Sequence, residues 1–211
     1  MIVGFSGIDG CGKSTYIKMI KKEYEVNILW TRIGYTPGMD KLKALARAIL
    51  GKKLPKPGRS DVRTKGLKNP FVQRVWITLA LIELFWIFII KARIKSFNKI
   101  LLLDRQLCDS IIDLKVLFGS EILQDPMYKA FIFIIGKLSP KIFKVGIFID
   151  YETSIYRCKN KFEPFPDTDE EKQIRVNFYN EKQVINDFEL LLDGNKSIEE
   201  NFKLIKEKSN L

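Results

Sequence analysis

The residues best suited to chemistry stand near the amino terminus, where a glycine-rich segment ends in a lysine and two hydroxyl residues. The segment matches the phosphate-binding pattern G-x-x-x-x-G-K-[ST]. Glycines let the backbone aim successive N–H groups at an anion, and a following helix points its positive end at the same place. We expect the contacts to a nucleotide to come from Gly7, Asp9, Gly10, Cys11, Gly12, Lys13, Ser14 and Thr15.

Two side chains of this loop have separate tasks in such a site. The Lys13 ammonium adds a point charge for the β- and γ-phosphates, and the Ser14 hydroxyl is suited to ligate Mg²⁺. The loop lies between an apolar run at 2–5 and a stretch from residue 16 to 24 with helical spacing of its apolar positions. This strand–loop–helix order is the context that the motif requires, and it disfavours a glycine-rich turn that binds nothing.

Further charged residues follow other apolar runs. Asp104 and Arg105 end the run 100–103, and Arg32 follows the run 26–31. Ligands of parallel α/β sheets bind outside the carboxyl ends of the strands, so we expect these side chains beside the loop. Asp104 would hold Mg²⁺ or orient the attacking oxygen, and Arg105 and Arg32 would bind the acceptor's phosphate. A purely structural Asp104–Arg105 pair and a solvated Arg32 remain open alternatives.

A second basic segment follows the predicted strand that ends at Asp150. Arg157 stands in the next helix, ahead of Lys159, Lys161 and a proline-rich stretch. The pattern predicts a lid at about 157–169 whose cations, Arg157 first, stabilise the charge of a transferred phosphoryl group. A solvated charged face is the alternative.

Apolar runs and helical stretches alternate along the chain, which is typical of a parallel sheet with helices on both faces. The predicted strands are 2–6, 26–31, 99–104, 143–150 and 188–193. The predicted helices are 13–24, 40–50, 71–96, 110–118, 126–138, 153–159, 169–187 and 197–208. The sequence therefore predicts a three-layer α/β fold with a five-stranded parallel sheet, in a single domain spanning residues 1–211.

Composition narrows the chemistry. Of 211 residues, 46% are hydrophobic, so the chain is globular, and the absence of histidine excludes a Ser–His or Cys–His nucleophile. The three cysteines, Cys11, Cys108 and Cys158, lie far apart in the sequence, which favours a reducing compartment. No signal peptide precedes the first strand, and we expect a cytoplasmic protein.

The net charge of +11 suits polyanionic partners, namely nucleotides, anionic lipid or nucleic acid, although a lysine-rich composition alone explains it equally well. A basic, proline-containing loop at 51–70 carries part of this charge, either as a flap near the site or as an ordinary connection.

The stretch 75–90 is almost wholly apolar, but it is shorter than a spanning helix and contains Glu83. A core or interface helix is the preferred interpretation, and peripheral membrane contact is not favoured. We expect a homodimer through this helix, with Trp76, Leu79, Glu83 and Trp86 among the candidates for the contact face.

These motifs resemble the thymidylate kinase family. Residues 5–15, FSGIDGCGKST, are similar to that family's phosphate loop F-E-G-I-D-G-S-G-K-S-T, and Leu103-Asp104-Arg105 is similar to the end of its D-R-Y strand. Residues 157–163 resemble its lid, and Tyr179 stands in a helix placed like the one after that lid. The resemblance implies a five-stranded parallel sheet, ATP as donor, Mg²⁺, often a homodimer, and contact of Asp9 with the acceptor sugar.

The chain departs from the family pattern at several positions. Ser6 stands for the usual glutamate, Gln106 for the tyrosine, and residues 78–84 lack the arginine of the base-recognition helix. Divergent members of the same family, associated with cell-surface polysaccharide genes, are also similar to this chain.

The leading hypothesis is ATP-dependent phosphoryl transfer to a nucleoside monophosphate, with dTMP as the preferred small-molecule acceptor. A second hypothesis keeps the kinase but gives it a nucleoside, sugar or lipid-linked acceptor, because the 75–90 helix is apolar and the 51–70 loop is basic. A third is a non-enzymatic nucleotide-dependent switch or nucleic-acid-binding module. No signature of specific nucleic-acid binding is present, and we expect no such partner.

Overall fold

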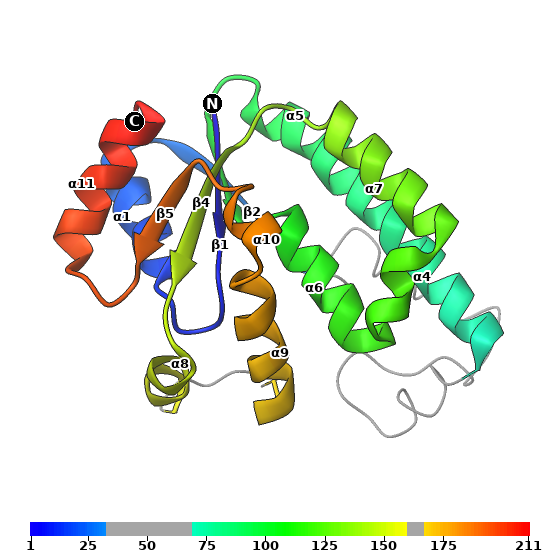
Figure 1. Ribbon diagram of the computed structural model, residues 1–211. Coiled ribbons are helices and arrows are strands. Elements are labelled where there is room, and N and C mark those ends of the chain that lie inside the picture. Colours follow the sequence, from blue (N-terminus) through cyan, green and yellow to red (C-terminus); the bar gives the residue numbers. More distant parts are fainter. Residues whose placement is uncertain (33–68, 160–166) are drawn as a thin grey trace.

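The computed structural model describes residues 1–32, 69–159 and 167–211. At its centre lies a five-stranded sheet in the order β2-β3-β1-β4-β5, in which every neighbouring pair is parallel (Figure 1). The strands are β1 (Ile2–Ser6), β2 (Val26–Trp30), β3 (Ile100–Asp104), β4 (Phe143–Phe148) and β5 (Leu190–Asp193). The predicted five-stranded parallel sheet is confirmed, with strand ends that differ by at most two residues.

Helices cover both faces of this sheet. Figure 1 shows α1 and α11 on one face, α4, α6 and α7 on the other, and α8 and α9 beyond the carboxyl ends of the strands. The helices are α1 (Lys13–Glu23), α4 (Pro70–Phe85), α5 (Ala92–Ser96), α6 (Leu107–Phe118), α7 (Pro126–Leu138), α8 (Tyr151–Cys158), α9 (Asp169–Tyr179), α10 (Lys182–Ile185) and α11 (Ile198–Ser209). A π-helical turn, Trp86–Lys91, joins α4 to α5, and a 3₁₀ turn, Ser120–Gln124, joins α6 to α7.

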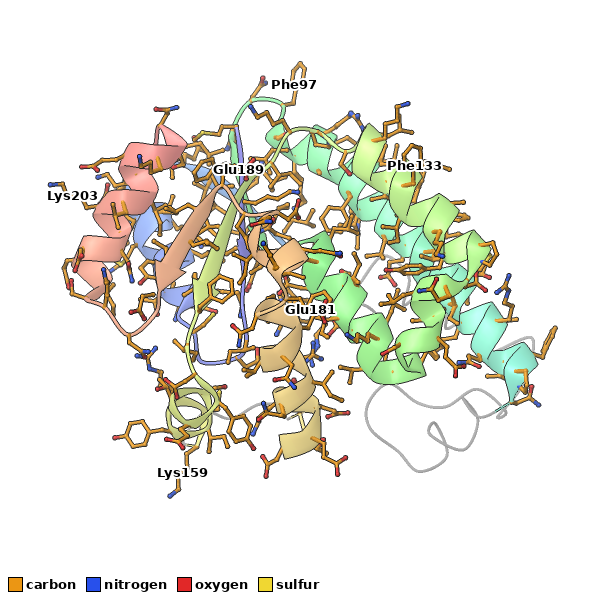
Figure 2. All side chains as sticks on the ribbon, viewed as in Figure 1. Phe97, Phe133, Lys159, Glu181, Glu189 and Lys203 are labelled. Carbon is orange, nitrogen blue, oxygen red and sulfur yellow. The ribbon has the colours of Figure 1, made fainter. Side chains whose placement is uncertain are left out.

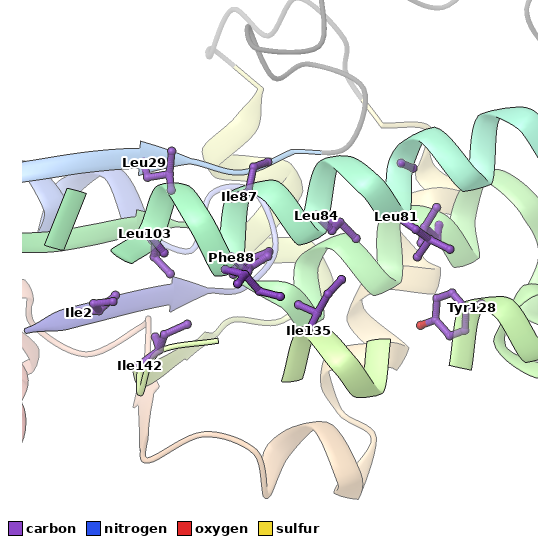
Figure 3. Packing of buried hydrophobic residues seen from close by; sticks show 14 of the residues in the cluster. Ile2, Leu29, Leu81, Leu84, Ile87, Phe88, Leu103, Tyr128, Ile135 and Ile142 are labelled. Carbon is purple, nitrogen blue, oxygen red and sulfur yellow. The ribbon is translucent and has the colours of Figure 1, made fainter. Parts of the chain in front are cut away.

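Successive side chains of a strand point to opposite faces of the sheet, and this explains why each face has its own hydrophobic core. In β3, Leu101 and Leu103 pack toward α4 and α7, whereas Leu102 packs toward α1 and α11, and all three are fully buried. Because both faces are covered, the strand is an uninterrupted apolar run. Figure 3 shows the first of these cores, where Phe88 lies between Leu103 of the sheet and Ile135 of α7.

The long apolar helix is continuous from Pro70 to Ser96 through the π-helical turn. It begins at Asn69, whose side-chain oxygen accepts from the amides of Phe71 and Val72. By length and composition the helix is apolar enough to cross a membrane, and half of its most apolar window is buried inside the protein. That burial agrees with the preferred interpretation as a core or interface helix.

One face of this helix stays in contact with solvent. Along α4 and the start of the π-helical turn, the exposed apolar side chains are Phe71, Val75, Ile82 and Trp86, spaced four, seven and four residues apart, so they follow one helical stripe. Ile94 of α5 is also exposed. Glu83 was predicted to belong to the contact face of a homodimer, and this prediction is wrong because the side chain is buried. Phe97 after α5 and Phe133 on α7 also project outward (Figure 2).

The helix predictions are wrong in three further places. The predicted helix 169–187 is two helices, α9 and α10, separated at Asn180 and Glu181. Helix α6 begins three residues before the predicted start, because Gln106 and Asp109 form a capping box. The 3₁₀ turn Ser120–Gln124 was not predicted. The predicted helix 40–50, nearly all of the basic loop 51–70, and residues 160–166 of the lid lie outside the described residues.

Candidate active site

The phosphate-binding motif forms the connection between β1 and α1. Gly7, Gly10 and Gly12 all have positive φ angles, 144°, 85° and 105°, which side chains with a Cβ rarely adopt. A Cβ on Gly7 would also collide with the carbonyl oxygen of Ile147 in β4. The curve of the loop therefore depends on these glycines, as the motif predicts.

Lys13, the first residue of α1, turns back toward this loop. Its Nζ donates to the carbonyl oxygens of Gly7 and Ile8, at 2.6 and 3.0 Å, and the side chain is buried. Ser14 and Thr15 are exposed in the first turn of the helix. Cys11 is buried, and its amide donates to the Ile8 carbonyl oxygen. The loop thus places an ammonium group and the end of a helix at one point.

Helix α8 and the segment after β5 contact the outer side of the phosphate-binding loop. The Ser154 hydroxyl donates to the Asp9 carbonyl oxygen at 2.7 Å. Arg157 donates from Nη1 to the carbonyl oxygens of Gly194 and Gly10, at 3.0 and 3.4 Å. Arg157 therefore lies against the backbone of the loop, apart from the arginines that gather around Asp9.

Asp104 and Arg105 stand next to the loop, as expected. Asp104 pairs in register with Phe5 of β1, and the Arg105 amide donates to the Phe5 carbonyl oxygen at 3.0 Å. Arg105 has a φ of 82°, and its buried guanidinium reaches the Asp9 carboxylate, with Nη2 and Oδ1 2.7 Å apart. This ion pair joins β3 to the phosphate-binding loop.

The two carboxylates of the site have opposite electrostatic surroundings. Burial alone raises the pKa of Asp9, but Arg105 and three further cations bring it well below its ordinary value. Those three cations are Lys13, Arg32 and Arg175. Burial raises the pKa of Asp104 above its ordinary value, and its neighbouring cations do not offset this. Asp9 is thus held in its ionised form, chiefly by its ion pair with Arg105.

A buried carboxylate behind Arg105 was not predicted. Asp109 accepts hydrogen bonds from the Tyr179 hydroxyl at 2.6 Å, from the Gln106 amide at 2.7 Å and from the Ser6 hydroxyl. Its Oδ1 lies 3.8 Å from Nη1 of Arg105. Ser6 and Gln106, two of the departures from the thymidylate kinase pattern, both belong to this network.

The third predicted arginine belongs to another chain of ion pairs. Arg32 lies 3.4 Å from Asp167, and Asp167 also binds Arg175 of α9, whose guanidinium faces Asp113 of α6 at 2.7 Å. Sequence reasoning missed Arg175, Asp113 and Asp167. One signal was present, since Arg105, Asp109 and Asp113 recur every four residues in a stretch that is otherwise largely apolar.

The residues present fit a nucleotide–magnesium complex. The glycine cradle has no room for added side chains at Gly7, Ser14 is exposed at the start of α1, and Asp104 ends the neighbouring strand. The described ranges contain no group of three or more metal-binding side chains. Mg²⁺ is usually held by one or two protein oxygens together with phosphates and water, and Ser14 and Asp104 offer two such oxygens.

The sheet order, the glycine loop and the flanking helices define a P-loop kinase fold. Solved structures of deoxyadenosine kinase from M. mycoides share it: the one with the products dCMP and a flexible dCDP has a TM-score of 0.63 at 19% identity, covering 100% of this chain and 99% of that chain. The same enzyme with bound dATP has a TM-score of 0.59 at 20% identity, covering 100% of both chains. With bound dCTP it has a TM-score of 0.59 at 21% identity, covering 100% and 99%. Comparisons with protein-family models and curated sequences find no match.

Proposed function

We propose that residues 1–211 act as one P-loop kinase domain that transfers the terminal phosphoryl group of ATP to a nucleoside monophosphate, with dTMP as the preferred acceptor. The observation that carries the proposal is the group of cations around Asp9. Lys13, Arg32, Arg105 and Arg175 all act on this one carboxylate of the phosphate-binding loop. Guanidinium and ammonium groups gathered beside the phosphate-binding loop, each able to exchange a carboxylate partner for a phosphate oxygen, suit two phosphate-bearing substrates that meet there.

The cations also favour an anionic acceptor over a neutral one. A phosphate oxygen of a monophosphate is already ionised at neutral pH, so attack on ATP needs no general base but needs screening of two like charges. Arg32 and Arg105, whose guanidinium groups bind carboxylates in the free protein, would provide that screening. Asp9 is a poor base because its pKa is well below the ordinary value.

Each residue has a stated part in the transfer. Lys13 and the amides of the loop bind the donor phosphates, and Arg157 adds charge from the α8 side. Ser14 and Asp104 would hold Mg²⁺, which when bound neutralises charge on the β- and γ-phosphates. Arg105 and Arg32 position the acceptor phosphate, and Asp9 orients the acceptor sugar, as the resemblance to thymidylate kinases implies.

A nucleoside acceptor is the second candidate, because the deoxyadenosine kinases share this fold. A sugar hydroxyl must lose its proton during transfer, so this reaction needs a general base. Asp104 is the best placed group, since burial raises its pKa toward the range in which a carboxylate accepts a proton. The two candidates therefore differ in what Asp104 does.

A coupled assay with ATP and Mg²⁺ separates them. The acceptors are dTMP, dCMP and dAMP, each beside its own nucleoside, and we expect turnover of a monophosphate, dTMP most rapidly. Lys13→Ala should lower the rate about 100-fold or more, whereas Lys18→Ala, an exposed lysine of the same helix, should leave it unchanged. Turnover of nucleosides alone would establish the second candidate, and no turnover at all would contradict both.

We also propose a homodimer in the cytoplasm, formed through the exposed stripe of α4 and the π-helical turn. Phe71, Val75, Ile82 and Trp86 form a row of large apolar side chains in contact with solvent. A twofold partner that presents the same stripe would bury it.

A further inference from the structure

A buried carboxylate joins two arginines beside the proposed acceptor site. Asp167 lies shortly before α9, and its Oδ2 accepts from Nε of Arg175 at 2.8 Å. Its Oδ1 lies 3.4 Å from Nη2 of Arg32. The side chain of Asp167 is only 8% exposed and that of Arg175 only 6%. Two oxygens on one anion thus bind two guanidinium groups, as a phosphate group would.

Arg175 also lies against a second carboxylate. Its Nη1 lies 2.7 Å from Oδ1 of Asp113. Burial lowers the pKa of the Arg175 guanidinium, but the Asp113 and Asp167 carboxylates together outweigh that effect, so that the pKa is raised. Arg175 therefore lies between two carboxylates, of which Asp167 is the one that also binds Arg32.

The position of these arginines connects them to the reaction. Both act on Asp9, the acid of the phosphate-binding loop, and Asp113 in turn acts on Arg105. Asp113 belongs to α6, the helix that directly follows Arg105, so the ion pairs of Arg175 and Arg32 lie next to the Asp9–Arg105 pair. Figure 1 shows α9 next to α8 at the carboxyl ends of the strands, where ligands of such sheets bind.

We propose that the Asp167 carboxylate takes the place of the acceptor's phosphate group in the free protein, and that Arg175 and Arg32 bind that phosphate once Asp167 has left. This inference rests on the proposed function, since a neutral nucleoside has no group to replace a carboxylate. Arg175 becomes a residue that distinguishes monophosphates from nucleosides. Asp167 becomes a competitor of the acceptor.

This competition is tested by the direction in which one substitution changes the affinity for monophosphates. Asp167→Asn keeps the shape of the side chain and removes its charge, so dTMP and dCMP should bind about three- to tenfold more tightly in calorimetry without ATP, while thymidine and deoxycytidine should bind as before. The matched control is Asp169→Asn, because Asp169 is two residues away with a side chain that is 77% exposed. If Asp167 only holds the fold together, its substitution weakens or leaves unchanged the binding of monophosphates, and the inference is overturned.

The tighter binding of monophosphates in Asp167→Asn must depend on Arg175. In the double variant Asp167→Asn/Arg175→Gln the tighter binding should disappear, and Arg175→Lys should recover part of it because the charge remains while the planar fork is lost. Unfolding midpoints of all variants show whether each one is folded. A gain that persists without Arg175 would also overturn the inference.

Inorganic phosphate separates this inference from the proposed function. If the wild-type chain neither binds nor phosphorylates a monophosphate, the proposed function fails. If the inference is nevertheless correct, the affinity for inorganic phosphate still rises in Asp167→Asn and falls again in the double variant. Equal phosphate affinity in wild type and Asp167→Asn, with monophosphate turnover intact, overturns the inference alone.

Discussion

The Tyr179 hydroxyl donates a hydrogen bond to Oδ1 of Asp109 at 2.6 Å, and this bond fastens α9 to the start of α6 across 70 residues of sequence. Both side chains are buried. The bond lies directly behind Arg105, which reaches Asp109 on one side and Asp9 on the other. Helix α9 and the phosphate-binding loop are therefore connected through three buried side chains.

Removing the Tyr179 hydroxyl should destabilise the protein. Tyr179→Phe takes one hydrogen-bond donor from a buried carboxylate, which costs about 1–3 kcal/mol of unfolding free energy. Urea titration measures the change, and Tyr156→Phe is the matched control because Tyr156 is 80% exposed. Equal losses in the two variants would show that the bond to Asp109 contributes nothing.

Asp9 should stabilise the fold at neutral pH. Its pKa in the folded protein lies below the unfolded value, so the stability it contributes is present above about pH 4 and is lost as the pH falls further. Asp9→Asn should therefore lower the unfolding free energy at pH 7. The difference from wild type should shrink below pH 4, and chemical denaturation across that range measures it.

Asp104 should have the opposite effect when no nucleotide or metal is present. Its pKa in the folded protein is raised by burial, so the stability that it contributes is present below the unfolded pKa, about 4, and is lost as the pH rises through the folded value. Asp104→Asn should be more stable than wild type at pH 7, with a smaller difference near pH 4. The same variant should be nearly inactive, and a destabilised Asp104→Asn at pH 7 would contradict the argument.

The Ser14 hydroxyl should set the magnesium requirement. Ser14→Ala removes one oxygen ligand, so the Mg²⁺ concentration for half-maximal activity should rise by about tenfold, roughly 1.4 kcal/mol. Ser14→Thr keeps a hydroxyl and should behave as wild type. An unchanged Mg²⁺ dependence in Ser14→Ala would place the ion elsewhere.

A charge on the exposed stripe of α4 should separate a dimer into monomers. Ile82→Glu places a carboxylate in the proposed interface, and sedimentation should show its mass halved at micromolar concentration. Ile198→Glu on α11 makes the same change at an isoleucine of equal exposure, 43% against 44%, and should remain dimeric. A wild-type protein that sediments only as a monomer contradicts the dimer itself.

The sequence predicts the parts of the site that depend on residues close together in the chain. The loop from Gly7 to Ser14 follows from spacing, and Asp104 and Arg105 follow because a buried strand ends before them. The partners of Arg175 could not be predicted, because Asp113 and Arg175 are 62 residues apart in sequence and meet only after α9 packs on α6. The break between α9 and α10 was not predicted, because the sequence around Asn180 and Glu181 contains no glycine or proline to indicate the end of a helix.

The support of the phosphate-binding loop from outside has an energetic consequence. A Cβ at Gly194 would lie 3.1 Å from the Cys11 carbonyl oxygen, and one at Gly10 would lie 3.2 Å from the Cys158 sulfur, so the loop is enclosed on both sides. Its conformational entropy is therefore lost when the chain folds rather than when a ligand arrives. A triphosphate then binds to a loop that is already ordered, and more of the interaction energy appears as affinity.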